Sequence, residues 1–120
     1  MPYDPTNIFA RVLRGEIPCR TVYEDAHALA FHDLHPQAPI HVLVIPKGAY
    51  VSLDDFSREA PPELVCGFLR AVGETARRLG LAEGGYRALM NTGPDGGQEV
   101  AHLHAHILGG RPLGRMVQPA

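Results

Sequence analysis

Several features are scarce in this chain of 120 residues, and each scarcity narrows what the protein can be. Tryptophan is absent, and the two cysteines, Cys19 and Cys66, are too few for a disulfide scaffold, so we expect a reducing compartment. No run approaches the roughly 18 consecutive apolar residues of a membrane span, and no secretory signal pattern opens the sequence. These absences predict a cytoplasmic protein with one domain over residues 1–120, of which 112–120 form a C-terminal tail.

An excess of charge of one sign is also lacking. The 11 basic and 13 acidic residues give a formal net charge of −2. This balance argues against a general nucleic-acid coat and against a polybasic membrane binder. A local anion site stays open, because backbone amides and histidines hold phosphate without a basic chain. The hydrophobic share of 45% is typical of a globular protein.

Glycine and proline divide the chain into short periodic segments. Helical spacing predicts a short helix over residues 7–14 and a long helix over 62–79, whose broad apolar stripe favours burial against a sheet and a second subunit. Residues 47–59 are expected to form a loop with at most one helical turn. Apolar and β-branched runs predict five strands, at 20–23, 28–32, 40–45, 86–90 and 100–108. The resulting fold class is α+β: a five-stranded antiparallel meander sheet with one short N-terminal helix and one long helix.

Three of the seven histidines, His102, His104 and His106, alternate with the apolar Leu103 and Ala105. Side chains alternate between the faces of a strand, so the three imidazoles are predicted to share one face. A merely solvated face is a poor explanation, because imidazoles titrate near neutrality and would repel one another when protonated.

A zinc site is one alternative, since His-x-His on a strand is a zinc donor pattern. A straight strand, however, places the outer Cα atoms about 13 Å apart, too far for three ligands of one ion. Two of the three histidines together with His41 or Asp33 could still bind a metal.

An anion site with a nucleophilic imidazole fits the surrounding residues better. The glycine-rich stretch 93–97 leads directly into the histidines, and Gly96 and Gly97 allow backbone amides to approach a ligand. Asn91 and Gln98 are neutral donors for phosphate oxygens. An imidazole attacks phosphorus through its unprotonated nitrogen, so this reading requires no metal or cofactor.

The segment His102-Leu103-His104-Ala105-His106-Ile107-Leu108 matches the His-φ-His-φ-His-φ-φ motif of the histidine triad (HIT) superfamily. It continues as Gly109-Gly110-Arg111, which resembles the Hint branch, the histidine triad nucleotide-binding proteins that act as purine nucleoside phosphoramidases. The similarity covers nearly the whole chain in further blocks, at 15–18, 23–25, 30–33, 36–39, 41–47 and 95–100. The chain departs from that pattern at Ala49, Ala101 and Glu99.

The resemblance implies a role for individual residues. His104 corresponds to the family nucleophile, His106 and His102 to its neighbours at the phosphate, and His41 to the fourth histidine of the site. Asp33 corresponds to the carboxylate that binds the ribose hydroxyls. The apolar slot for the base corresponds to Ile8, Phe9, Val12 and Leu34. The positions on the phosphate side correspond to Asn91, Gly97 and Glu99.

The implied function is hydrolysis of the P–N bond of purine nucleoside phosphoramidates, or of related acyl adenylates, through a covalent nucleotidyl-histidine intermediate. The expected partners are a purine nucleoside monophosphate and a second copy of the chain, with the sheet continued across the homodimer. Two alternatives stay open at this point: a nucleotide-binding scaffold with incidental activity, and a histidine-rich zinc-binding protein.

Overall fold

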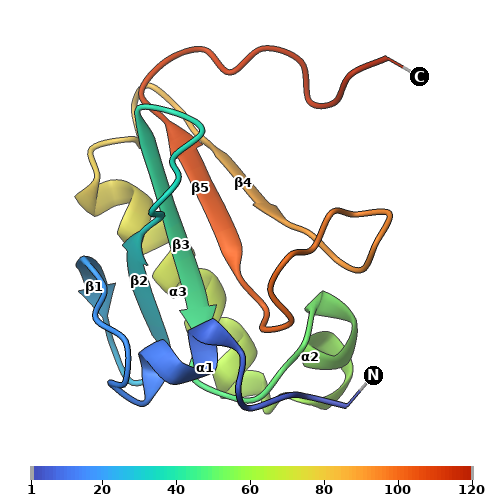
Figure 1. The fold of residues 1–120 in the computed structure, drawn as a ribbon. Coiled ribbons are helices and arrows are strands. Elements are labelled where there is room, and N and C mark those ends of the chain that lie inside the picture. The colour runs from blue at the N-terminus through green and yellow to red at the C-terminus, as the bar shows by residue number, and fades with distance from the viewer. Residues whose placement is uncertain (1, 120) are drawn as a thin grey trace.

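An open antiparallel sheet of five strands forms the centre of the structure, a computed structural model that describes residues 2–119 (Figure 1). The strands lie in the order β1-β2-β3-β5-β4, so β1 to β3 form a meander and β5 returns between β3 and β4. The predicted α+β class and the five antiparallel strands are confirmed. The strands are β1 (Thr21–Glu24), β2 (Ala28–His32), β3 (Ile40–Pro46), β4 (Arg87–Met90) and β5 (Ala105–Gly109).

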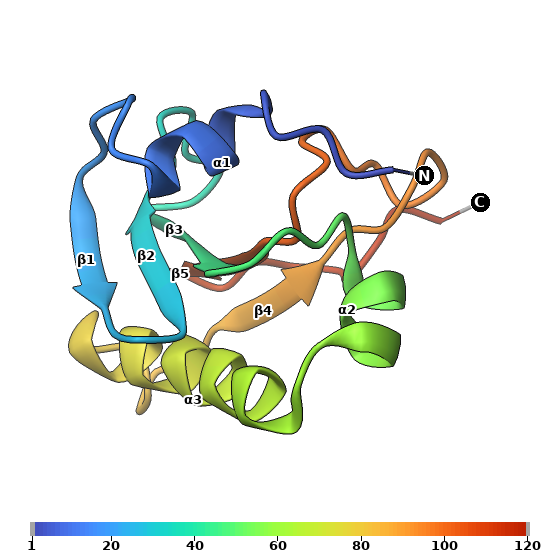
Figure 2. The ribbon, with the colours of Figure 1, turned by 90° about the horizontal axis from the view of Figure 1, so that it is seen from below.

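Helices cover both faces of this sheet. The short helix α1 (Ile8–Leu13) lies on one face and the long helix α3 (Pro62–Arg78) on the other, as Figure 2 shows. Asn7 caps α1, because its side chain accepts a hydrogen bond from the amide of Ala10. Within residues 2–119, no helix is long and apolar enough to cross a membrane.

A third helix, α2 (Leu53–Glu59), occupies part of the segment predicted as a loop with at most one helical turn. A capping box starts it: Ser52 caps the first amides, and the carboxylate of Asp55 accepts from the amide of Ser52 in return. The Ser-x-x-Asp spacing was visible in the sequence and is the signal that predicts such a helix start.

The strands β2 and β3 are buried on both faces. On the α3 side, Ala30 and Val44 pack with Phe68 in one apolar cluster. On the α1 side, Phe31 and Leu43 pack with Phe9 in a second cluster. This explains the apolar run 40–45: apart from His41, each successive side chain enters one or the other of two cores.

The last strand is shorter than predicted. It begins at Ala105 instead of residue 100, so His102 and His104 precede β5 and do not lie on a regular strand. The ladder pairs Val44 with Ala105 and stops where β3 reaches Pro46, which has no amide hydrogen to donate. Upstream of this point, the amide of Leu103 donates to the carbonyl of Tyr50 instead.

Candidate active site

Four histidines from two neighbouring segments gather on the α1 side of the sheet. His41 lies on β3 and His106 on β5, and His104 and His102 follow from the stretch just before β5. The rings of His104 and His106 have their centroids 5.0 Å apart, and those of His41 and His106 are 5.2 Å apart. The structure therefore brings together the four histidines predicted to form the site.

The ring of His41 sets the tautomer of His106. Its Nδ1 accepts a hydrogen bond from the amide of Gln37 at 3.0 Å, so a neutral His41 carries its proton on Nε2. Nε2 lies 2.9 Å from Nδ1 of His106 and donates to it. His106 in turn carries its own proton on Nε2, and that N–H is left as a hydrogen-bond donor in the site.

His104 has the opposite tautomer. Its Nδ1 lies 2.7 Å from the main-chain carbonyl of His102, and because a carbonyl only accepts, Nδ1 carries the proton. The lone pair of a neutral His104 is therefore on Nε2. The ring is buried, and the edge of Phe9 on α1 packs against it at a centroid distance of 4.9 Å.

His102 is fully buried and supports its neighbour through its main chain. Its Nε2 lies 3.2 Å from the carbonyl of Pro46 and donates to it. Its Nδ1 then accepts, and the hydroxyl of Tyr3 lies 2.6 Å from that nitrogen. Both ring nitrogens of His102 are thus occupied by hydrogen bonds to other residues of the protein. The main-chain carbonyl of His102 orients His104.

Burial keeps the four rings neutral. Removal from water lowers the pKa of His102 to about 4. Burial first, and then the proximity of His104 and His41, lowers the pKa of His106 to about 4, against the opposing charge of Asp33. Burial also lowers the pKa of His104, against the opposing effect of the His102 carbonyl and of the carboxylates of Asp33 and Glu99. For His41, burial lowers the pKa and the charge of Asp33 opposes it.

Asp33 has two contacts, one for each carboxylate oxygen. Oδ1 accepts from the amide of His35 and closes a turn after β2. Oδ2 lies 3.4 Å from Nε2 of His41, on the edge of the histidine cluster. Asp33, His41 and His106 each offer one ligand atom, and these atoms all lie within 4.8 Å of one another, so these three residues could together hold a metal ion.

The residues predicted to form the apolar slot divide into two pairs. Phe9 and Val12 are buried and pack with Leu29, Phe31 and Leu43, so both belong to the core beneath α1. Ile8 is 43% exposed and Leu34 is 80% exposed. Only this second pair is free to cover a flat ligand, and contact with a base stays a prediction for all four.

The loop before the histidines is closed by its own hydrogen bonds. The amides of Gly97 and Gln98 donate to the carbonyls of Pro94 and Gly93. Gly97 has a φ of 75°, a conformation that favours glycine. The side-chain Nε2 of Gln98 donates to the carbonyls of Val51 and Val100, which ties the loop to the start of α2. Gln98 thus has a structural part, while its contact with phosphate stays a prediction.

Asn91 and Glu99 lie at the two ends of this loop. Asn91 follows β4 directly and is half-buried, and Glu99 is exposed, three residues before His102. A cleft of about 920 Å³ opens there, between the N-terminal arm, α2 and the loop. Tyr3, Glu99 and Ala101 line it, while the four histidines lie outside its lining.

The comparisons with known proteins agree with this geometry. A HIT domain family model matches residues 14–113. The chain belongs to the HIT family. It is 63% identical over 115 residues to a 13.2 kDa HIT-like protein of Azospirillum brasilense, covering 96% of this chain and 94% of that one. It is 46% identical over 110 residues to the purine nucleoside phosphoramidase of Escherichia coli K12, covering 92% of each.

Solved structures share the fold of this HIT protein. A HIT family hydrolase from Clostridium thermocellum is 35% identical, with a TM-score of 0.86 over 94% of this chain and 97% of that one. A HIT family hydrolase from Legionella pneumophila is 42% identical, with a TM-score of 0.82 over 88% of this chain and 94% of that one. The resemblance drawn from the histidine run is confirmed.

Sequence reasoning missed three parts of the site. The carbonyl of Pro46, the carbonyl of Val51 and the hydroxyl of Tyr3 each bind a residue of the histidine segment or of its loop. All three hydrogen bonds join residues that lie far apart in the chain, and no local sequence pattern predicts such contacts.

Proposed function

We propose that this HIT protein is a hydrolase that cleaves the P–N bond of purine nucleoside phosphoramidates through a nucleotidyl-histidine intermediate. One observation carries the proposal: Nδ1 of His104 donates to the carbonyl of His102 at 2.7 Å, which leaves the lone pair on Nε2. The similarity to the phosphoramidase of E. coli supports the choice of substrate class.

The chemistry follows from the tautomers. Nε2 of His104 attacks the phosphorus, a bond from phosphorus to the imidazole forms, and the bond to the departing nitrogen breaks as that nitrogen takes up a proton from solvent and leaves as an amine. Water then attacks the phosphorus and releases a proton to solvent, the phosphorus–imidazole bond breaks, and the nucleoside monophosphate leaves. Nε2–H of His106 is the donor for the phosphoryl oxygens, where negative charge develops.

The substrate is held by groups around the rings. We assign the ribose hydroxyls to the carboxylate of Asp33, and the base to the exposed side chains of Ile8 and Leu34 beside Phe9. Asn91 and the loop of Gly97 and Glu99 lie on the phosphate side. A burial-lowered pKa keeps His104 unprotonated at neutral pH, so no base is needed to activate it.

The deciding experiment is a quenched single-turnover reaction with a labelled adenosine phosphoramidate. The wild type is expected to carry label on His104 through an acid-labile P–N bond. His104→Asn is expected to lose turnover by more than the roughly 10²–10⁴-fold typical of a missing acid or base, while still binding the nucleoside monophosphate. His27→Gln, which replaces a histidine on the opposite side of the sheet, is the matched control and keeps wild-type turnover.

The metal alternative rests on the proximity of Asp33, His41 and His106. A metal-dependent hydrolase would be inactivated by a chelator, would recover with zinc, and would carry no label on protein. A scaffold would bind the nucleotide with no turnover above that of His104→Asn. Chelator-insensitive turnover with a labelled His104 contradicts both alternatives.

A further inference from the structure

We propose that Tyr3 is a positioning residue for the histidine triad. Tyr3 acts through His102 and thereby holds His104 in its nucleophilic tautomer. Its hydroxyl anchors the ring of His102, and the carbonyl of that residue orients His104. The catalytic part of this inference rests on the proposed function, whereas its structural part does not.

The contact itself is short and specific. The hydroxyl oxygen of Tyr3 lies 2.6 Å from Nδ1 of His102, across 99 positions of the chain. The two rings meet edge to face, with centroids 5.7 Å apart. Because Nε2 of His102 is already the donor to the carbonyl of Pro46, its Nδ1 is an acceptor and needs a donor from elsewhere. The Tyr3 hydroxyl supplies it.

The surrounding structure makes this donor important. His102 has no exposed surface, so an unpaired Nδ1 would be cut off from water. Within residues 2–119, every buried side-chain nitrogen or oxygen has a hydrogen-bond partner. Removing the Tyr3 hydroxyl therefore creates an unsatisfied acceptor in the segment that carries the nucleophile.

The position of His102 in the backbone explains how the effect reaches His104. His102 precedes β5, so the strand ladder does not hold it. The two ring anchors, Tyr3 and the Pro46 carbonyl, act on opposite nitrogens and fix the orientation of the residue. With one anchor lost, the ring can turn about the other, the His102 carbonyl tilts, and the preference of His104 for Nδ1–H weakens.

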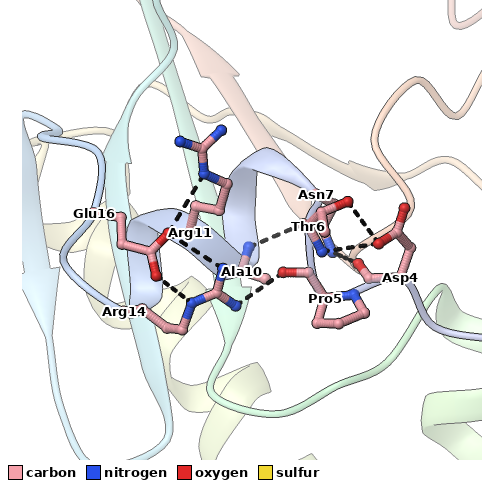
Figure 3. Close-up of polar contacts among 8 residues, drawn as sticks. All are labelled: Asp4, Pro5, Thr6, Asn7, Ala10, Arg11, Arg14 and Glu16. Atoms are coloured by element: carbon pink, nitrogen blue, oxygen red, sulfur yellow. Dashed lines mark hydrogen bonds and ion pairs between the residues drawn. The ribbon is translucent and has the colours of Figure 1, made fainter.

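The N-terminal arm is built to hold Tyr3 in place. Oδ1 of Asp4 accepts from the amide and the hydroxyl of Thr6, and the side chain of Asn7 donates to the carbonyl of Asp4 (Figure 3). Arg14 reaches back from the end of α1 and donates to the carbonyl of Pro5 at 2.9 Å. The arm and α1 therefore form one unit, which delivers both Tyr3 and Phe9 to the histidines.

The direct test is Tyr3→Phe in protein with ¹⁵N-labelled histidine rings. The wild-type spectrum should show His104 as a single Nδ1–H tautomer. In Tyr3→Phe we expect the Nδ1 signal of His102 to shift and a fraction of His104 to carry its proton on Nε2. Tyr23→Phe is the matched control, because it removes a tyrosine hydroxyl that donates to Asp25 at 2.9 Å, far from the triad. It should leave both histidine rings unchanged.

Kinetics give the second readout. In Tyr3→Phe we expect kcat for the phosphoramidate to fall roughly five- to tenfold, the factor that about 1–1.4 kcal/mol represents, with KM within twofold of wild type. Unchanged His104 ring signals overturn the proposal, and so does a raised KM with unchanged kcat, which would make Tyr3 a substrate contact. If the wild type showed no turnover, the proposed function would be wrong. The proposal for Tyr3 would still be tested, because the ring signals of His102 and His104 do not depend on turnover.

Discussion

Single side chains set the chemistry of this site through burial. A histidine in water has a pKa near 6.5, and the histidines of the site have lower values because their charged forms have lost water. Neutral rings each have one donor and one acceptor, so the carbonyls of His102 and Pro46 and the amide of Gln37 decide the tautomers. Protonation of His41 or His106 would put a hydrogen on a nitrogen that accepts in this pattern and would break it.

The first prediction concerns pH. The pKa of His102 is lowered in the folded state, so the unfolded chain binds more protons between pH 6.5 and about 4. The stability that this neutral ring contributes is fully present above pH 6.5 and is lost as the pH falls toward 4, on the order of 3 kcal/mol over that range. Urea unfolding between pH 7 and 4 measures this loss. A free energy of unfolding that stays flat over this interval contradicts the assignment.

With His104 as the proposed nucleophile, turnover should follow the protonation of this ring. Because burial lowers the pKa of His104, the acid limb of kcat/KM is expected below pH 6.5, with a flat profile from there to neutrality. A pH–rate profile of the wild type tests this, and an acid limb centred above pH 6.5 would show that His104 is not held neutral.

The next prediction separates the two contacts of Asp33. Loss of a charge-assisted contact to the ribose hydroxyls, worth roughly 1.5–3 kcal/mol, should raise KM about 10- to 100-fold in Asp33→Ala, with a smaller effect on kcat. Asp33→Asn is the comparison, because it keeps one oxygen for the amide of His35 but replaces the charge and the second oxygen with an NH2 group that only donates. If the wild type handles ribose and 2′,3′-dideoxyribose substrates alike, Asp33 does not bind the ribose.

At the scale of elements, the end of β3 determines where its neighbour β5 begins. Pro46 closes β3, so the ladder with β5 stops at Ala105 and the two preceding histidines leave the strand. This departure turns His102 toward Pro46 and Tyr3. A regular strand through residue 100 would instead have placed all three imidazoles in one row.

Helix α2 gives a prediction at the same scale. Ser52 is buried and caps α2, and Asp55 accepts from the amides of Val51 and Ser52. Ser52→Ala should lower the free energy of unfolding by about 1 kcal/mol, as the loss of a cap generally does. Urea unfolding measures the change, with Ser57→Ala, an exposed serine on the same helix, as the control. Equal stability of the two variants would show that the capping box contributes nothing.

For the whole molecule, we predict a homodimer. The sheet ends at β4, and Leu69 on α3 is 60% exposed, so a 13.0 kDa chain leaves an open sheet edge and an apolar side chain uncovered. Sedimentation at micromolar concentration should give twice the mass of the chain. Leu69→Glu should shift the equilibrium toward monomer, whereas Leu53→Glu, at an exposed leucine on α2, should not. A stable 13.0 kDa wild-type monomer would refute the dimer.

The sequence by itself determined the fold class, the burial of strand 40–45 on both faces and the alternating histidine run 102–106. Local periodicity carries this information: the run 40–45 is apolar except for His41 because both of its faces are covered, and the spacing of His102, His104 and His106 is itself a local pattern. The sequence offered Thr6 and Asn7 as caps of α1, and the structure selects Asn7; the Ser52 capping box of α2 was also visible as a local pattern.

Only the tertiary structure decided where β5 begins, which nitrogen of each ring carries the proton, and that Tyr3 reaches His102. Each of these depends on a partner far away in the chain, such as Pro46, 56 positions from His102. The physical reason is that a hydrogen bond to a buried ring depends on which carbonyl or hydroxyl the fold places within about 3 Å of it, and no spacing along the chain records that distance.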